Sequence, residues 1–327
     1  MTSKIEISHR TIIFTLLLLA SVWVILQIRD ILFLLFIAFI LMSALRPFVE
    51  WLSWMRIPRF LAVLGIYSIV LGFVGISLLG SIPTIVLQST RLANELPRFV
   101  EKVMPYWNID TRALTQQIAP IGENILKLTV GIFSNIITTV TVLVFTFYFL
   151  IERRHVENIL LDTFGETQAK TILTVLRDIE LRLGAWVRGE LLLMFLVGGG
   201  VYLGLTLLRI EFALPLAIIA GLLEIVPMIG PIVSAVLAVL VALATSPLLA
   251  LSVVALYFII QQVENSVIVP LVMRKSVGLA PVITILSLLI GSRLAGVTGA
   301  ILAVPIVLVL QVVLSAFLNK SSKDRSP

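Results

Sequence analysis

Cysteine is absent from this chain, and charged residues are scarce. Without cysteine, neither a disulfide framework nor thiolate chemistry is possible. Only 13% of the 327 residues are charged, against about 25% in ordinary soluble domains. The composition therefore excludes an ordinary water-soluble globular domain.

Sequence motifs of the common catalytic sites are also missing. There is no Gly-x-x-x-x-Gly-Lys-Ser/Thr loop, so ATP does not drive this chain directly. The two histidines, His9 and His155, fall outside the apolar runs, and neither belongs to a His-Glu-x-x-His metal site. No Gly-x-Ser-x-Gly elbow is present. We therefore expect no enzymatic activity, no cofactor and no metal site.

Apolar residues dominate what is present. They make up 59% of the chain, and the mean hydropathy is +1.13. The apolar runs are near-continuous and often reach about 18 residues, unlike the alternating ten-residue segments of a membrane β-barrel. This pattern predicts an all-α, polytopic helical membrane protein. We expect several membrane segments, including two re-entrant or broken helical hairpins.

Basic residues indicate the orientation of the chain in the bilayer. The first apolar run, about Thr11–Ile28, is long for a signal peptide and has no small-residue cleavage site after it. Lys4 and Arg10 precede it, and residues 46–59 carry three arginines beside two tryptophans. Clustered arginine marks the cytoplasmic side. We expect cytoplasmic N- and C-termini, and we attribute the net charge of +6 to topology rather than to nucleic-acid binding.

Changes in composition divide the chain into six regions. The expected regions are three N-terminal spans (1–82), an extracytoplasmic amphipathic segment (83–128), span four (129–151), a cytoplasmic amphipathic helical segment (152–188), a transport core with broken hairpins (189–318) and a cytoplasmic tail (319–327). Within the core, Gly198-Gly199-Gly200 favours close packing of helices, and a hinge is the alternative.

Two parts of this core have arms that are short for a membrane crossing. Phe212–Val226 and Ile232–Thr245 form one pair, and Leu279–Ile290 and Val297–Phe317 form the other. Most of these arms are shorter than the roughly 20 residues that span a bilayer. Each pair is therefore predicted to form a re-entrant hairpin or two short tilted spans.

The first break carries Glu224 and the sequence Pro-Met-Ile-Gly-Pro. Pro227 and Pro231 remove backbone donors and stop a helix, and Gly230 allows a sharp turn. Backbone carbonyls freed in this way can bind a cation or a polar solute where they line a cavity. Glu224 could bind H⁺ or a cation. The alternative is a hydrated loop at the membrane surface.

A second polar group lies inside the span at about Leu248–Val272. Its members are Gln261, Gln262, Glu264 and Asn265, with Pro270 shortly after them. On an α-helix, Gln261, Glu264 and Asn265 would share one face. Such a face could hold a small polyol or a hydrated ion. Hydrogen bonding between helices is the alternative.

Arg293 lies at residues 291–296, between the arms of the second hairpin, and Pro305 interrupts the arm that follows. A charge at bilayer depth costs about 2.5–3.5 kcal/mol on insertion scales, so it needs a partner or a wet cavity. Arg293 could pair with Glu224 or Glu264, or could cap the extracytoplasmic tip of the hairpin.

Five of these motifs, in this order and spacing, resemble those of the autoinducer-2 exporter family, also called PerM-like permeases. The matching segments are Glu224–Pro231, Gln261–Asn265, Ile268–Pro270, Leu279–Pro281 and Gly299–Pro305. The resemblance extends over nearly the whole chain. It implies a secondary transporter with about eight membrane segments, located in a cell inner membrane, that forms a homo-oligomer.

The resemblance also implies the kind of cargo. Members export autoinducer-2, a small polar furanone derivative that acts as a quorum signal. Other members resemble Na⁺(Li⁺)/H⁺ antiporters, which makes H⁺ or Na⁺ a candidate coupling ion.

Three hypotheses about function follow. In the first, a small polar solute is exported from a site where the 212–246 hairpin, the 248–272 span and the 279–316 hairpin meet, gated at both breaks. In the second, Glu224 and Glu264 are the ion-binding carboxylates of a cation/proton antiporter. In the third, the chain transports nothing, and residues 152–188 recruit a partner protein.

Overall fold

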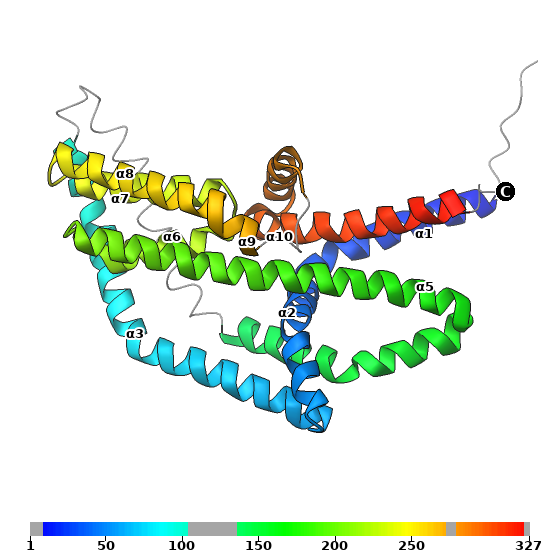
Figure 1. The fold of residues 1–327 in the computed structure, drawn as a ribbon. Helices are drawn as coiled ribbons and strands as arrows, with labels where there is room; N and C mark the ends of the chain where they lie inside the picture. The colour runs from blue at the N-terminus through cyan, green and yellow to red at the C-terminus, as the bar shows by residue number, and fades with distance from the viewer. Residues whose placement is uncertain (1–8, 104–135, 273–278, 324–327) are drawn as a thin grey trace, which may run out of the picture.

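The computed structural model describes residues 9–103, 136–272 and 279–323, and they form helices without a single strand (Figure 1). The helices are α1 (His9–Gln27), α2 (Arg29–Trp54), α3 (Arg59–Val103), α5 (Ile136–Leu207), α6 (Ala213–Leu223), α7 (Ile229–Leu243), α8 (Pro247–Val263), the π-helix η2 (Glu264–Ile268), α9 (Val269–Val272) and α10 (Pro281–Lys323). The predicted all-α class is confirmed.

Several of these helices are suited to a bilayer. Four are long and apolar enough to cross one, at Arg29–Trp54, His155–Leu207, Pro247–Val272 and Pro281–Leu318, and shorter apolar helices accompany them. The side chains of α1 from Ile13 to Gln27 are all exposed, although most are apolar. Exposed apolar surface of this extent belongs against lipid or another protein. The chain is a multi-pass membrane protein.

The middle of the chain differs from the segments that we expected. Helix α3 continues through residue 103 without a break, and residues 104–135, which hold most of the expected extracytoplasmic segment, lie outside the described residues. Helix α5 continues without interruption across the expected boundary between span four and the 152–188 segment. Instead, α5 reverses direction at Gly165, whose φ of 73° and ψ of 165° are not helical. Figure 1 shows α5 as two long arms joined at this turn.

Both predicted breaks are present in the structure. Helices α6 and α7, of 11 and 15 residues, are separated by a non-helical stretch that ends at Met228, with φ 68°. Helix α10 is broken at Ala295 (φ −141°) and Gly296 (φ 59°). The arms on either side of this break touch, because a side chain on Gly291 would clash with the carbonyl oxygen of Gly299. Each break thus separates two helical arms. Both arms of the first pair are short, whereas the second arm of α10 runs from residue 297 to Lys323.

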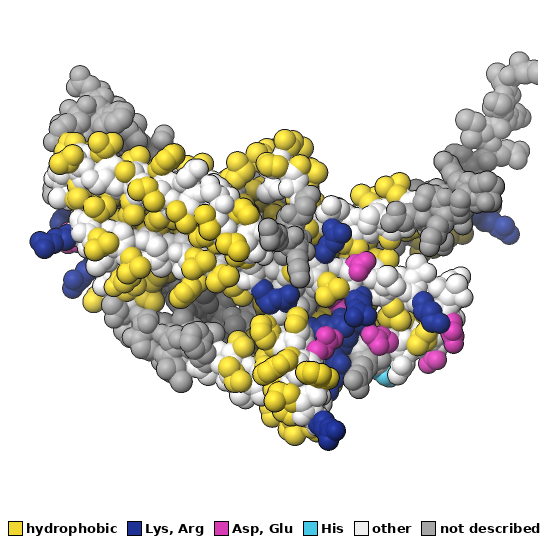
Figure 2. All heavy atoms as spheres, in the orientation of Figure 1, with side chains coloured by type: hydrophobic (Ala, Val, Ile, Leu, Met, Phe, Trp, Pro, Cys, Tyr) yellow, Lys and Arg dark blue, Asp and Glu magenta, His cyan; other side chains and the backbone are white. Residues whose placement is uncertain are grey.

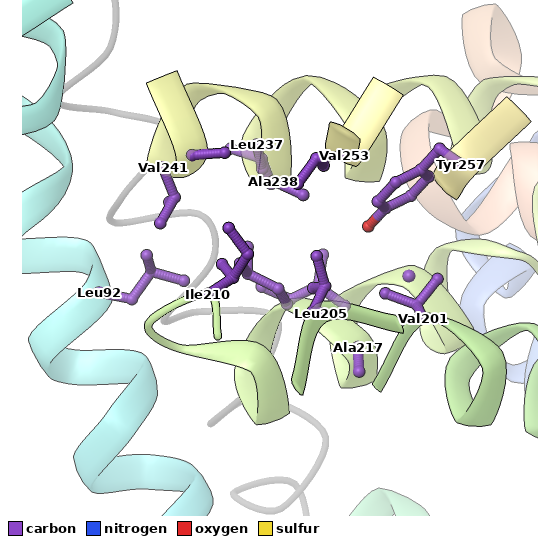
Figure 3. Close-up of a cluster of buried hydrophobic side chains, with 14 of the residues drawn as sticks. Leu92, Val201, Leu205, Ile210, Ala217, Leu237, Ala238, Val241, Val253 and Tyr257 are labelled. Atoms are coloured by element: carbon purple, nitrogen blue, oxygen red, sulfur yellow. The ribbon is translucent and has the colours of Figure 1, made fainter. Parts of the chain in front are cut away.

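Two large apolar clusters contain different stretches of the second arm of α5. The first cluster, here called the hairpin core, joins α5 to α3, α6, α7 and α8 (Figure 3). The second cluster, here called the α10 core, joins α5 to α2 and α10. The second arm of α5 is therefore the central element that both clusters share.

Candidate functional site

The break between α6 and α7 brings a carboxylate into the hairpin core. Glu224 caps the C-terminus of α6, and its side chain is 4% exposed. Pro231 sits in the first turn of α7, where its missing N–H leaves no helical hydrogen bond unmade. The expected turn at Gly230 is wrong, because the left-handed residue is Met228. Gly230 is instead required for packing, since a Cβ there would clash with the carbonyl of Leu223.

The second polar motif is rearranged by a π-helix. Helix α8 ends at Val263, and residues Glu264–Ile268 continue the chain as a π-helix, whose turns are wider than those of an α-helix. Glu264 is only 6% exposed, and its Oε2 accepts a hydrogen bond of 3.1 Å from Gln261 Nε2. The predicted common face does not include Asn265, which is exposed. π-Turns inside α-helices are frequent at functional sites.

Gln262 and Pro270 lie outside this buried group. Gln262 is exposed, and its Nε2 donates to Ser266 Oγ at 3.3 Å. Pro270 is exposed in the short α9. Of the second motif, the structure therefore brings only Gln261 and Glu264 toward the first.

A third carboxylate, which the sequence did not single out, is buried in the same region. Glu190 on α5 is 4% exposed. A Cβ on Gly221 of α6 would lie 2.8 Å from the carbonyl oxygen of Met194, and one on Gly198 would lie 3.3 Å from the Cα of Gly221. The helices therefore cross closely at Gly198, as predicted. One turn along α5 from Met194 is Glu190, and one turn along α6 from Gly221 is Glu224.

The three glutamates, here called the carboxylate triad, interact through their charges. Glu264 acts electrostatically on both Glu190 and Glu224, and Glu190 acts on Glu224. Among the described residues, no ion pair links any of the three to a basic side chain. Burial of unpaired carboxylates is costly. A bound proton would offset this cost, whereas among the described residues no group of three or more His, Asp or Glu side chains is arranged to hold a metal ion.

One carboxylate oxygen of the triad, Glu224 Oε2, is buried without a hydrogen-bond partner. The hydroxyl of Tyr257 on α8 is also buried, and it interacts with Ser234 of α7. Figure 3 shows the oxygen of Tyr257 pointing from α8 toward the side chains of α5 and α6. Buried polar atoms are rarely left unsatisfied. Glu224 Oε2 therefore remains available to a polar ligand.

The turn of α10 is separate from the triad. Arg293 is exposed beside this turn, and no ion pair within the described chain connects it to Glu224 or Glu264. This arrangement favours the hypothesis that Arg293 caps the tip of the hairpin over the hypothesis that it pairs with Glu224 or Glu264. Pro305 is buried within the second arm of α10.

The expected meeting of three elements at one site is wrong. Helix α10 packs chiefly on α5, whereas α6, α7 and α8 pack on the other part of α5. The α10 turn instead borders a cavity of about 650 Å³ together with Arg29, Asp30 and Thr138. This cavity and the triad are two distinct polar places in the molecule.

Comparisons with known proteins agree with this architecture. Residues 12–319 match the family described as "AI-2E family transporter". The "Putative transport protein YrrI" of Bacillus subtilis is 28% identical over 293 residues, covering 84% of this chain and 83% of that protein. The "Putative transport protein YueF" of the same species is 28% identical over 290 residues, covering 81% and 77%.

A permease is also among the similar proteins. The "Putative permease PerM" of Escherichia coli K12 is 24% identical over 251 residues, covering 74% of this chain and 71% of that protein. The family match covers nearly the whole chain, and the names of the relatives agree on transport. The chain belongs to the AI-2E family of transporters.

Proposed function

We propose that this protein is a secondary transporter that exports a small polar solute, such as autoinducer-2, through the hairpin core. The observation that carries the proposal is the carboxylate triad, which is buried among apolar helices and forms no ion pair with a basic side chain of the described residues. Charged groups inside the membrane-spanning part of a protein usually belong to substrate or ion pathways. Broken helices near the middle of the bilayer are where secondary transporters place such sites.

The groups around the triad suit a solute with several hydroxyl or carbonyl groups. Gln261 and Glu264 already form a hydrogen-bonded pair, and Glu224 Oε2 is free to accept a hydrogen bond. Three carboxylates that form no ion pair within the described part of the chain would repel an anionic solute. We expect a neutral or cationic cargo.

The two breaks are the proposed gates. The stretch 224–228 interrupts the helical pair beside the triad, and the Ala295–Gly296 turn borders the 650 Å³ cavity. Non-helical backbone inside a membrane protein is tolerated where it lines a cavity or is buried in protein. Movement at either break would change access to a polar space.

Flux measurements in proteoliposomes test this proposal. Labelled autoinducer-2 should cross in an imposed pH gradient, and Glu264→Gln should cut the flux at least roughly tenfold, equivalent to about 1.4 kcal/mol. Glu166→Gln, which alters an exposed residue on α5, is the matched control and should transport normally. Normal flux in correctly inserted Glu264→Gln protein would remove Glu264 from the mechanism.

The triad also supports a second candidate, a Na⁺(Li⁺)/H⁺ antiporter that uses Glu224 and Glu264. Buried carboxylates that lack a basic partner are suited to exchange a cation for a proton. In this case a pH step drives Na⁺ flux, and autoinducer-2 has no effect. If neither autoinducer-2 nor Na⁺ crosses the membrane, the third hypothesis is favoured, in which residues 152–188 recruit a partner protein.

A further inference from the structure

A charged cleft lies where α2 meets the turn of α5, away from the carboxylate triad. One hollow of about 400 Å³ and another of about 460 Å³ share Arg46, Arg153 and Glu157 in their walls, so they adjoin. Figure 2 shows Lys, Arg, Asp and Glu side chains gathered in this part of the molecule, while apolar side chains dominate the rest of the visible face.

Two arginines in the cleft are held in place from beneath. Glu180, whose side chain is 1% exposed, accepts hydrogen bonds from Arg46 Nη1 and, at 2.5 Å, from Arg153 Nε. Arg46 Nε also donates to Glu50 at 2.6 Å, and Arg153 Nη1 donates to Glu157 at 3.1 Å. Each guanidinium has five N–H donors, so these bonds leave donors for a ligand.

Basic side chains outnumber acidic ones in the walls of the cleft. The basic ones are Arg46, Arg59, Arg153, Lys170 and Arg177, and the acidic ones are Glu50 and Glu157. Glu180 beneath them, and Glu166, which forms an ion pair of 3.0 Å with Lys170, reduce the excess of positive charge without cancelling it. Ser53 also lines the cleft, and its buried hydroxyl has no hydrogen-bond partner. Positive charge, fixed guanidinium groups and a free hydroxyl together suit an oxyanion.

The apolar surroundings of the cleft identify the source of that anion. Trp54 lines the cleft and is 86% exposed, and Trp51 and Phe60 nearby are 59% and 56% exposed. Tryptophan at a membrane surface sits at the level of the lipid headgroups. Arginine matches the geometry of a phosphate by donating two parallel hydrogen bonds.

We propose that this cleft binds a phosphate group, supplied by an anionic phospholipid whose acyl chains lie along the exposed side chains of α2 and α3. The proposal is independent of the transported solute, because no residue of the cleft belongs to the hairpin core.

Lipid titration of the purified full chain, followed by native mass spectrometry, tests the proposal. Phosphatidylglycerol should bind more tightly than phosphatidylcholine. The double variant Lys170→Gln/Arg177→Gln should weaken phosphatidylglycerol binding by about thirtyfold, because each basic residue near anionic lipid is worth about 1 kcal/mol. Both side chains are exposed, so the variant should fold. Arg91→Gln/Arg98→Gln on α3, with the same change of charge, should bind like the wild type.

Inorganic phosphate separates the two possible sources of the anion. If excess phosphate does not displace phosphatidylglycerol, the lipid is the ligand; displacement at low phosphate concentration would assign the cleft to a soluble phosphate compound. Equal binding of the two lipids, or an equal loss in both double variants, would overturn the proposal. A pull-down in which the Lys170/Arg177 variant loses a partner protein that the wild type captures, while its lipid binding is unchanged, would also overturn the proposal.

Discussion

Two buried glutamates, Glu180 and Glu190, lie on the second arm of α5, and their surroundings are opposite. Glu180 in the α10 core touches two guanidinium groups, from α2 and from the first arm of α5. Glu190, three turns later, interacts electrostatically with Glu224 and Glu264, and no basic side chain pairs with them in the described structure. On one helix, Glu180 is thus neutralised by two arginines, whereas Glu190 forms no ion pair with a basic side chain of the described residues.

The difference separates structural charge from functional charge. A buried charge whose partners are all protein groups stabilises one arrangement of helices, because losing any partner is costly. A buried charge without a protein partner needs a ligand, and its protonation or occupancy can change during a transport cycle. The comparison predicts that substitutions at Glu180 affect folding, whereas substitutions in the triad affect transport.

The largest effect is expected from Glu180→Gln. This change leaves Arg46 and Arg153 without their shared countercharge, and breaking a buried ion pair in this way costs about 3–5 kcal/mol. Thermal unfolding of the detergent-purified protein, followed by size-exclusion chromatography, measures the loss. A variant as stable as the wild type would show that the Glu180 network is not what fixes α2 against α5.

Gly221→Ala should produce the next largest change in stability. The added methyl group would lie 2.8 Å from the Met194 carbonyl, and overpacking of this kind costs about 1–3 kcal/mol. Because the crossing sets the separation of Glu190 and Glu224, solute flux should fall as well. Gly199→Ala is the control: its Cβ would meet nothing within 4 Å, so neither stability nor flux should fall. Equal behaviour of the two variants would mean that the crossing does not position the triad.

Glu224→Gln should barely change stability. The amide keeps the shape of the side chain and removes one of three neighbouring carboxylates, so we expect a shift within about 1 kcal/mol, and toward greater stability. Flux should nevertheless fall at least roughly tenfold. Thermal unfolding and flux measured on the same preparation give both quantities. Strong destabilisation would place Glu224 with Glu180 as a structural charge.

The smallest effect is expected at Glu166→Gln. Glu166 and Lys170 form an exposed ion pair of 3.0 Å across one helical turn. Exposed pairs of this type contribute about 0.3–0.5 kcal/mol. Thermal unfolding at low and high salt should therefore differ little between this variant and the wild type. A loss comparable to that of Glu180→Gln would remove the contrast between buried and exposed pairs.

The helical class and both broken hairpins were predictable because composition, run length and proline act locally. Glu224 and Glu264 stood out for the same reason, as carboxylates inside apolar segments, and both are buried. Asn265 was misplaced because a π-turn changes the spacing of side chains, and the sequence around it has no feature that specifies such a turn. Gly230 was assigned to a turn, although close packing on Leu223 is what requires it.

Glu190 was missed because its role depends on a contact between helices. It follows Arg188 at the boundary between a charged segment and an apolar run, where a carboxylate in water would be ordinary. The available signal was the pair of small residues, Gly198 and Gly221, whose close approach brings Glu190 beside Glu224. Tertiary pairing of this kind cannot be read from the period of one helix.

Flux through Glu190→Gln tests the central claim most directly, since the structure alone places Glu190 in the triad. Proteoliposomes with an imposed pH gradient would be assayed for labelled autoinducer-2, Na⁺ and proton movement, with Glu166→Gln as the control. We predict that Glu190→Gln folds and inserts normally and loses the gradient-driven flux that the control retains. Wild-type flux with unchanged proton coupling in Glu190→Gln would contradict the assignment of the carboxylate triad as the working site.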